Sequence, residues 1–192
     1  MDNESIAKYL YEMGHLKRVK RSGWWLIGIR DPESVAEHVY RAAVLGYILA
    51  VLDGGADPMR VACICLFHDN GETRIGDLNK VTSRYIPSKD GEIQAIVEQS
   101  ARLPKLAAEQ ILALVSEYEE RSSHDGDLAH DADQLECMLQ AREYVAQGHP
   151  HAQDWIDRSF SRLKTEVAKQ LAEACMQMDP YTWWEGLKVR PT

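Results

Sequence analysis

The sequence lacks an excess of basic residues and has no obvious targeting segment. It contains 22 Lys and Arg against 30 Asp and Glu, which gives a formal net charge of −8 over 192 residues. A surface that binds polymeric nucleic acid is normally strongly basic, so we expect no such partner. The N-terminus has neither a basic nor an apolar signal region, and we expect no stretch to approach the roughly twenty apolar residues of a membrane span. These features predict a cytosolic protein without a membrane partner.

Cysteine is also scarce, and its spacing does not favour a zinc clamp. Cys63 and Cys65 would point to nearly opposite faces of a helix, which is poor geometry for binding one ion. With Cys137 and Cys175 they lie in apolar helical patterns, so we expect free buried thiols. No internal repeat or low-complexity tract is visible, and the length is typical of one domain.

Helical periodicity accounts for most of the chain. Apolar residues recur at the spacing of one helical face in seven segments, at about 5–15, 34–52, 57–69, 90–100, 104–121, 128–146 and 152–178. Residues 16–34 show no clean period and are expected to be extended or turn. Residues 122–127, SSHDGD, are expected to form a polar loop. The sequence therefore predicts an all-α fold.

Two of these helices place histidines at the same end of a hairpin. Ser34 and Glu37 have the spacing of a capping box, and His38 then lies within an apolar stripe. The next helix runs back and ends at His68 and Asp69. Buried imidazole and carboxylate groups need hydrogen bonds, a paired charge or a cation, and a divalent metal satisfies both kinds of group at once.

The helix expected at 128–146 offers a further carboxylate. Asp133 shares a face with Ala129 and Cys137, which are small and uncharged, so this side is expected to be buried. Asp131 shares its face with Leu135 and is a competitor for the same role. Periodicity alone leaves both aspartates open.

A basic segment precedes two tryptophans near the N-terminus, where Arg21 is followed closely by Trp24. One interpretation is a solvated basic edge with tryptophans that anchor a loop on the core. The other is an arginine that contacts phosphate beside an aromatic ring that packs on a sugar or base. Composition alone favours the first.

The combined pattern H…HD…D, with the string HDxxExxxGD at residues 68–77, resembles the HD-domain metal-dependent phosphohydrolases, in particular their 5′-deoxynucleotidase branch. The resemblance covers about residues 10–145 and includes the flanking strings DPESVAEHVYR and DADQLE. It implies a single all-α HD-domain helical bundle over residues 1–192, with additional C-terminal helices at about 150–187.

The resemblance also implies a set of functional residues. One divalent cation, Mn²⁺, Co²⁺, Fe²⁺, Ni²⁺ or Zn²⁺, would be bound by His38, His68, Asp69 and Asp133. Glu72 and Asp77 would carry the acid–base work. Arg21 would contact the phosphate, and Trp24 or a neighbour would form a wall against the sugar.

The chain departs from the bacterial nucleotidases at this last point. Their arginine is followed directly by tryptophan, whereas Ser22 and Gly23 separate Arg21 from Trp24 here. The form Arg-x-Gly-Trp is closer to the eukaryotic-type HD-domain relatives, and it leaves the preference for deoxyribose open. Between the HD pair and the last aspartate only His124 and His130 are found, which argues against a two-metal phosphodiesterase.

We therefore expect a metal-dependent phosphohydrolase that releases phosphate from (deoxy)nucleoside 5′-monophosphates through a metal-activated water. A related enzyme that acts on a diphosphate or cyclic nucleotide is one alternative. A non-catalytic helical module with a structural metal is another, although such a module would gain nothing from two extra carboxylates at the rim of its site. The resemblance implies a homodimer and a small-molecule nucleotide substrate.

Overall fold

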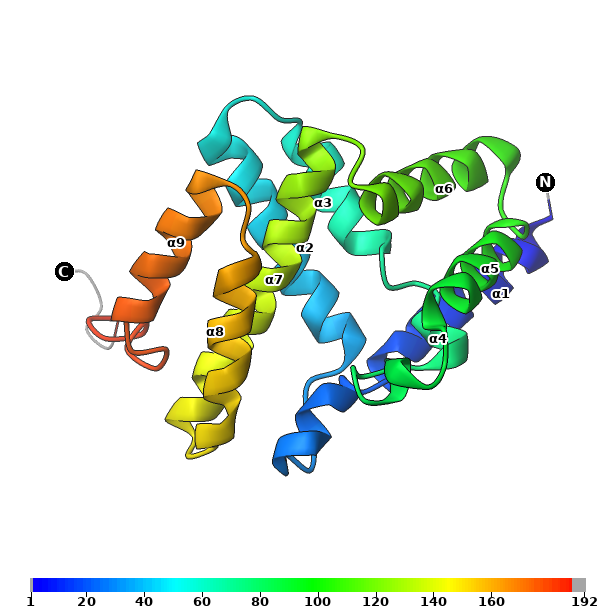
Figure 1. Ribbon diagram of the computed structural model, residues 1–192. Coiled ribbons are helices and arrows are strands. Elements are labelled where there is room, and N and C mark those ends of the chain that lie inside the picture. The colour runs from blue at the N-terminus through cyan, green and yellow to red at the C-terminus, as the bar shows by residue number, and fades with distance from the viewer. Residues whose placement is uncertain (1, 188–192) are drawn as a thin grey trace.

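Two long helices, α2 (Val35–Asp53) and α7 (His124–Ala146), run through the middle of the computed structural model, which describes residues 2–187 (Figure 1). Helix α3 (Pro58–Phe67) packs against both, and α8 (Gln153–Arg162) and α9 (Glu166–Gln177) cover α7 on one side. The other α-helices are α1 (Asn3–Met13), α4 (Glu72–Ile75), α5 (Ser88–Ser100) and α6 (Lys105–Glu120). Four short 3-10 helices are η1 (Gly14–Lys17), η2 (Ser22–Ile27), η3 (Thr82–Arg84) and η4 (Pro150–Ala152). Apart from one isolated bridge between Lys20 and Ser34, residues 2–187 contain no β-structure, which confirms the all-α prediction.

The α2–α3 hairpin forms as the sequence predicts. The hydroxyl of Ser34 accepts a hydrogen bond from the Glu37 amide, and the Glu37 carboxylate accepts one from the Ser34 amide, which completes the capping box. The two helices then cross closely at Gly46. A Cβ at this position would lie 2.9 Å from Sγ of Cys65, so only glycine allows this approach. The crossing fixes how the polar ends of the two helices face one another.

Three apolar clusters hold the helices together, and one of them consists of Leu16, Val35 and Val39 at the start of α2. The largest one joins α2, α3, α7, α8 and α9 around fully buried side chains such as Leu49, Ile64 and Leu135. A smaller core forms between α1, α5 and α6, which lie on the far side of α3 from α8 and α9 (Figure 1). The polar ends of α2 and α3 lie between these two cores.

Helix α2 differs from the expectation about membrane spans. It has 19 residues with a hydropathy of 1.4, which by length and composition alone is enough to cross a membrane. Its inner face carries buried His38 and packs on α3 and α7, so in this fold α2 occupies the position of a central core helix. Its outer face remains apolar.

One local expectation was wrong, that for residues 122–127, and two others are made more specific. Residues 122–127 are not a loop, because Ser123 caps α7 and the bare Cα of Gly126 fits against the Glu117 carbonyl, where a Cβ would be 2.9 Å away. The last long helix is broken at residues 163–165, where Thr165 caps α9. Residues 16–34 contain 3-10 turns rather than an extended segment.

Candidate metal centre

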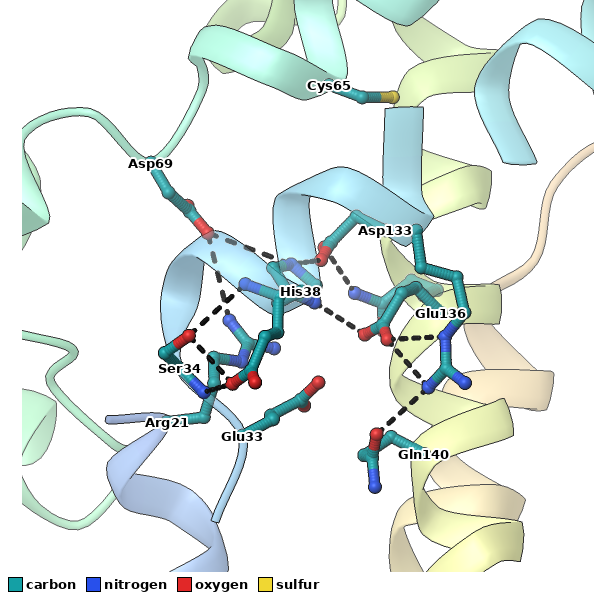
Figure 2. A network of polar contacts seen from close by, with 12 residues as sticks. Arg21, Glu33, Ser34, His38, Cys65, Asp69, Asp133, Glu136 and Gln140 are labelled. Carbon is teal, nitrogen blue, oxygen red and sulfur yellow. Dashed lines mark hydrogen bonds and ion pairs between the residues drawn. The ribbon is translucent and has the colours of Figure 1, made fainter. Parts of the chain in front are cut away.

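Side chains from three helices converge at one end of the α2–α3 hairpin. His38 lies near the start of α2, His68 caps the end of α3, and Asp69 follows directly. One ligand atom from each of these residues lies within 4.8 Å of the other two. From α7, Oδ1 of Asp133 lies 3.1 Å from Nε2 of His38 (Figure 2). The structure thus brings together the four residues that the sequence nominates as metal ligands.

Unpartnered atoms at this centre fit a metal ion. Within the described residues, Nε2 of His38, Oδ2 of Asp69 and Oε2 of Glu72 are buried without a hydrogen-bond partner. Nε2 of His38 faces Asp69 at 3.7 Å and Asp133 at 3.1 Å, but neither contact has the geometry of a hydrogen bond. Burying imidazole and carboxylate groups unpaired is costly. A divalent cation of the kind that prefers mixed nitrogen and oxygen ligands would remove that cost.

The opposite edge of the His38 ring is held by Glu136. Nδ1 of His38 lies 2.5 Å from Oε2 of Glu136, and both side chains are fully buried. Arg41 donates a hydrogen bond of 2.9 Å to the other oxygen of Glu136. Burial and the charge of Arg21 act to lower the pKa of His38, but Glu136 and Asp133 together outweigh them and the pKa lies well above its usual value. Glu136 therefore fixes the ring so that Nε2 points to the centre.

A second group of candidate ligands, Glu33, His38 and Glu136, lies on the Nδ1 side of the ring. The groups there are already engaged, because Glu136 binds His38 and Arg41, and Oε1 of Glu33 accepts a hydrogen bond of 3.1 Å from Trp24. Burial, followed by the charge of Glu136, raises the pKa of Glu33 to about 7. The Nε2 side, with its unpartnered atoms, therefore fits a cation better.

The two candidate aspartates of α7, Asp131 and Asp133, have different surroundings. Asp131 accepts hydrogen bonds of 2.8 and 2.7 Å from the backbone amides of residues 164 and 165, where α9 begins. Oδ2 of Asp133 accepts a hydrogen bond of 3.1 Å from the Tyr118 hydroxyl, and this leaves Oδ1 directed at His38. The structure places Asp133 at the centre and Asp131 away from it.

Glu72 and Asp77 lie on either side of Asp69. Asp77 accepts a hydrogen bond of 2.9 Å from the Ser22 amide, and its Oδ2 is 3.9 Å from Nε of Arg21. Burial, followed by Asp69 and Asp77, raises the pKa of Glu72 well above its usual value. Burial also raises the pKa of Asp77, although Arg21 acts against it. Both carboxyl groups hold a proton at higher pH than a solvated carboxyl group, which suits acid–base chemistry.

A cavity of about 320 Å³ opens onto the centre. Its inner wall is made by Arg21, His68, Asp69, Asp77 and Asp133. Trp24 and Trp155 contribute aromatic surface, with ring centroids 5.4 Å apart, and Trp24 is only 2% exposed, so it is a fixed wall. Nη1 of Arg21 lies 3.8 Å from Asp69, close to where a phosphate would approach the centre. Glu72 is not part of this wall and is buried near Asp69, whose charge acts on it.

Known proteins with similar sequences agree with the resemblance seen in the sequence motifs. The sequence matches the HD domain family over residues 13–175. The chain belongs to the HD domain family. A human protein named 5′-deoxynucleotidase HDDC2 is 31% identical over 87% of this chain and 82% of its own length. The protein of the same name from Dictyostelium discoideum is 35% identical and covers 83% of this chain and 90% of its own length.

Two solved structures resemble this protein along most of the chain. A structure described as a predicted metal-dependent phosphohydrolase from Magnetospirillum magnetotacticum is 25% identical, with a TM-score of 0.71, over 91% of this chain and 93% of that one. A conserved hypothetical protein from Pyrococcus furiosus is 27% identical, with a TM-score of 0.74, over 90% and 99% of the two chains. The similarity therefore extends past the motifs into the C-terminal helices.

Several residues around this HD-domain centre were not found from the sequence. Glu136 follows Asp133 by three residues on the same helix, and this spacing is the sequence signal that could have identified it. Trp155 looked like part of an ordinary amphipathic helix. Ser22 separates Arg21 from Trp24 in the sequence. Its amide donates a hydrogen bond of 2.9 Å to the Asp77 carboxylate, and its hydroxyl donates one of 2.7 Å to the backbone carbonyl of Asp77. The inserted serine therefore ties the arginine segment to the centre.

Proposed function

We propose that this HD-domain protein is a metal-dependent phosphomonoesterase that releases phosphate from nucleoside 5′-monophosphates, with deoxynucleotides as the first class to test. The observation that carries the proposal is the set of buried, unpartnered atoms on His38, Asp69 and Glu72 beside the cationic side chain of Arg21. The relatives named 5′-deoxynucleotidase support the choice of substrate. The metal would be held by His38, His68, Asp69 and Asp133.

When bound, a divalent cation supplies Lewis acidity and lowers the pKa of a water toward neutrality. Arg21 neutralises charge on the non-bridging phosphate oxygens, since its guanidinium is directed at the inner end of the cavity. Asp77 is part of the cavity wall and gives a proton to the leaving 5′ oxygen. Glu72 is almost fully buried and, in its ionised form, accepts the proton of the nucleophile. Each such proton transfer is typically worth about 10²–10⁴ in rate.

Phosphate release from a panel of ribo- and deoxyribonucleoside 5′-monophosphates with Mn²⁺ or Co²⁺ tests this function. Asp133→Ala should lose metal and activity together, whereas Glu72→Gln should retain metal and lose turnover. A structural metal site would instead bind metal and release no phosphate from any nucleotide. Turnover confined to cyclic nucleotides or diphosphates would select the other enzyme class.

The two carboxyl roles can be separated with an aryl phosphate whose leaving group needs no proton. The defect of Asp77→Asn should become small on this substrate, because general acid catalysis is no longer required. The defect of Glu72→Gln should remain, because the nucleophile must still lose a proton. Equal defects on both substrates would contradict the assignment.

We also propose a homodimer formed through the outer face of α2 and α3. This face gathers the apolar side chains of Tyr40, Val44, Tyr47, Ile48 and Leu66, all at least 41% exposed. Exposed apolar surface of this kind usually marks an interface, and a two-fold axis would bury the same face on both copies. Light scattering should give twice the chain mass for the wild type and the single mass for Tyr47→Glu. A monomeric wild type that sediments with lipid vesicles would assign the face to a membrane instead.

A further inference from the structure

The mouth of the cavity carries three cations in addition to Arg21 at its inner end. Lys80, Arg158 and Arg162 all line the cavity, and all three are exposed. They gather here on a chain whose net charge is −8, so a general basic surface does not account for them.

Two separate segments deliver these cations. Lys80 follows Asp77 by three residues on the segment that leaves the centre. Arg158 and Arg162 lie on α8, one and two turns after Trp155, and the three share the helix face that borders the cavity. Ile156 of the same helix is buried in the core, so the orientation of α8 is fixed by packing.

These charges are only partly compensated. Arg158 pairs with Asp154 at 2.8 Å, and Arg162 donates a hydrogen bond of 3.5 Å to the Gln134 side chain. Among residues 2–187, no carboxylate lies within ion-pair distance of Lys80 or Arg162. Burial, followed by the charges of Arg162 and Arg158, lowers the pKa of Lys80, in keeping with the shared position of the three side chains on the cavity. Like charges brought together repel, and an anion bound between them would relieve that repulsion.

The order of groups along the cavity defines the ligand. Burial gives this order: the side chains of Arg21, His68, Asp69 and Asp133 are at most 18% exposed, Trp24 is buried and Trp155 half-buried, and the three cations that line the same cavity are exposed. A nucleoside 5′-monophosphate has charge only at its 5′ phosphate, so it leaves the mouth unused. We propose that Lys80, Arg158 and Arg162 form an anion subsite for a second phosphoryl group on the sugar 3′ oxygen of the substrate. This inference rests on the proposed function, since it takes the 5′ phosphate to lie at the metal centre.

The test compares kcat/KM for a deoxynucleoside 3′,5′-bisphosphate with kcat/KM for the matching 5′-monophosphate, in the same buffer and with the same divalent cation. The wild type should prefer the bisphosphate by about tenfold or more at low salt, and the ratio should fall as salt rises. Lys80→Gln and Arg162→Gln should each lower the ratio by about three- to tenfold. Lys105→Gln removes an equal charge from an exposed position outside the cavity and should leave the ratio unchanged.

In a 5′-phosphorylated dinucleotide the 3′ phosphoryl group is a diester rather than a monoester. Its kcat/KM shows whether the subsite also accepts a 3′ phosphodiester. A wild-type ratio near one, or an unchanged ratio in both subsite variants, overturns the subsite while turnover of the monophosphate leaves the proposed function standing. If neither nucleotide is hydrolysed, the proposed function fails. In that case calorimetry on the wild type and the three variants tests the subsite. The ratio of the dissociation constants of the 5′-monophosphate and the bisphosphate then replaces the ratio of kcat/KM values.

Discussion

Glu136→Gln isolates the effect of the group behind His38. The change keeps the size of the side chain and an oxygen that can accept from Nδ1, but it removes the negative charge 2.5 Å from that nitrogen in a fully buried setting. A hydrogen bond to a charged partner contributes about 1.5–3 kcal/mol against about 0.5–1.5 for a neutral one. The expected loss is therefore about 1.4 kcal/mol, or about tenfold weaker metal binding.

Glu143→Gln is the matched control for this change. Glu143 pairs with the same Arg41 at 2.6 Å, and no contact between Glu143 and His38 is seen among the described residues. Both variants remove one carboxylate from Arg41, but Glu143 is partly exposed and Glu136 is fully buried, so Glu136→Gln should lower thermal stability more. Titration of Mn²⁺ into the metal-free proteins should show about tenfold weaker binding for Glu136→Gln and little change for Glu143→Gln. Equal metal affinity in the two variants would refute the orienting role.

Three further predictions concern the fold and its pH dependence. Asp131→Ala should lower the free energy of unfolding by about 3 kcal/mol in urea denaturation, because Thr165 and its neighbour lose their shared acceptor, while metal content stays unchanged. Gly46→Ala should cost about 1–3 kcal/mol in the same assay, because its Cβ would meet Cys65 at 2.9 Å. Glu33 keeps its proton up to about pH 7 in the folded protein but loses it near its ordinary pKa of 4.5 when unfolded. Its contribution to stability is therefore present below pH 4.5 and lost as pH rises to 7. Glu33→Gln should flatten that decline in metal-free protein, and a variant whose melting temperature falls with pH as steeply as the wild type would contradict this.

The convergence of His38 and His68 could be predicted because each lies at a helix position that local sequence defines. His38 follows a capping box by one residue, and His68 ends an apolar run, so helical rise alone places them at one end of the hairpin. The structure agrees, with ring centroids 5.9 Å apart. The all-α class follows from the same periodicity.

The choice between Asp131 and Asp133 could not be made in this way. Helix α7 is buried on several sides, so its apolar pattern does not identify one inner face. Only the docking of α9 onto Asp131 shows which carboxylate is used for structure. The cations at the mouth of the cavity were missed for a similar reason, because they depend on how α8 packs against α7.

Anomalous diffraction from crystals grown with Mn²⁺ or Co²⁺ tests the central claim most directly. The account predicts a single anomalous peak within coordination distance of His38, His68, Asp69 and Asp133, on the Nε2 side of the His38 ring. A peak between Glu33 and Glu136 on the Nδ1 side, or a peak that Asp133 does not reach, would contradict it.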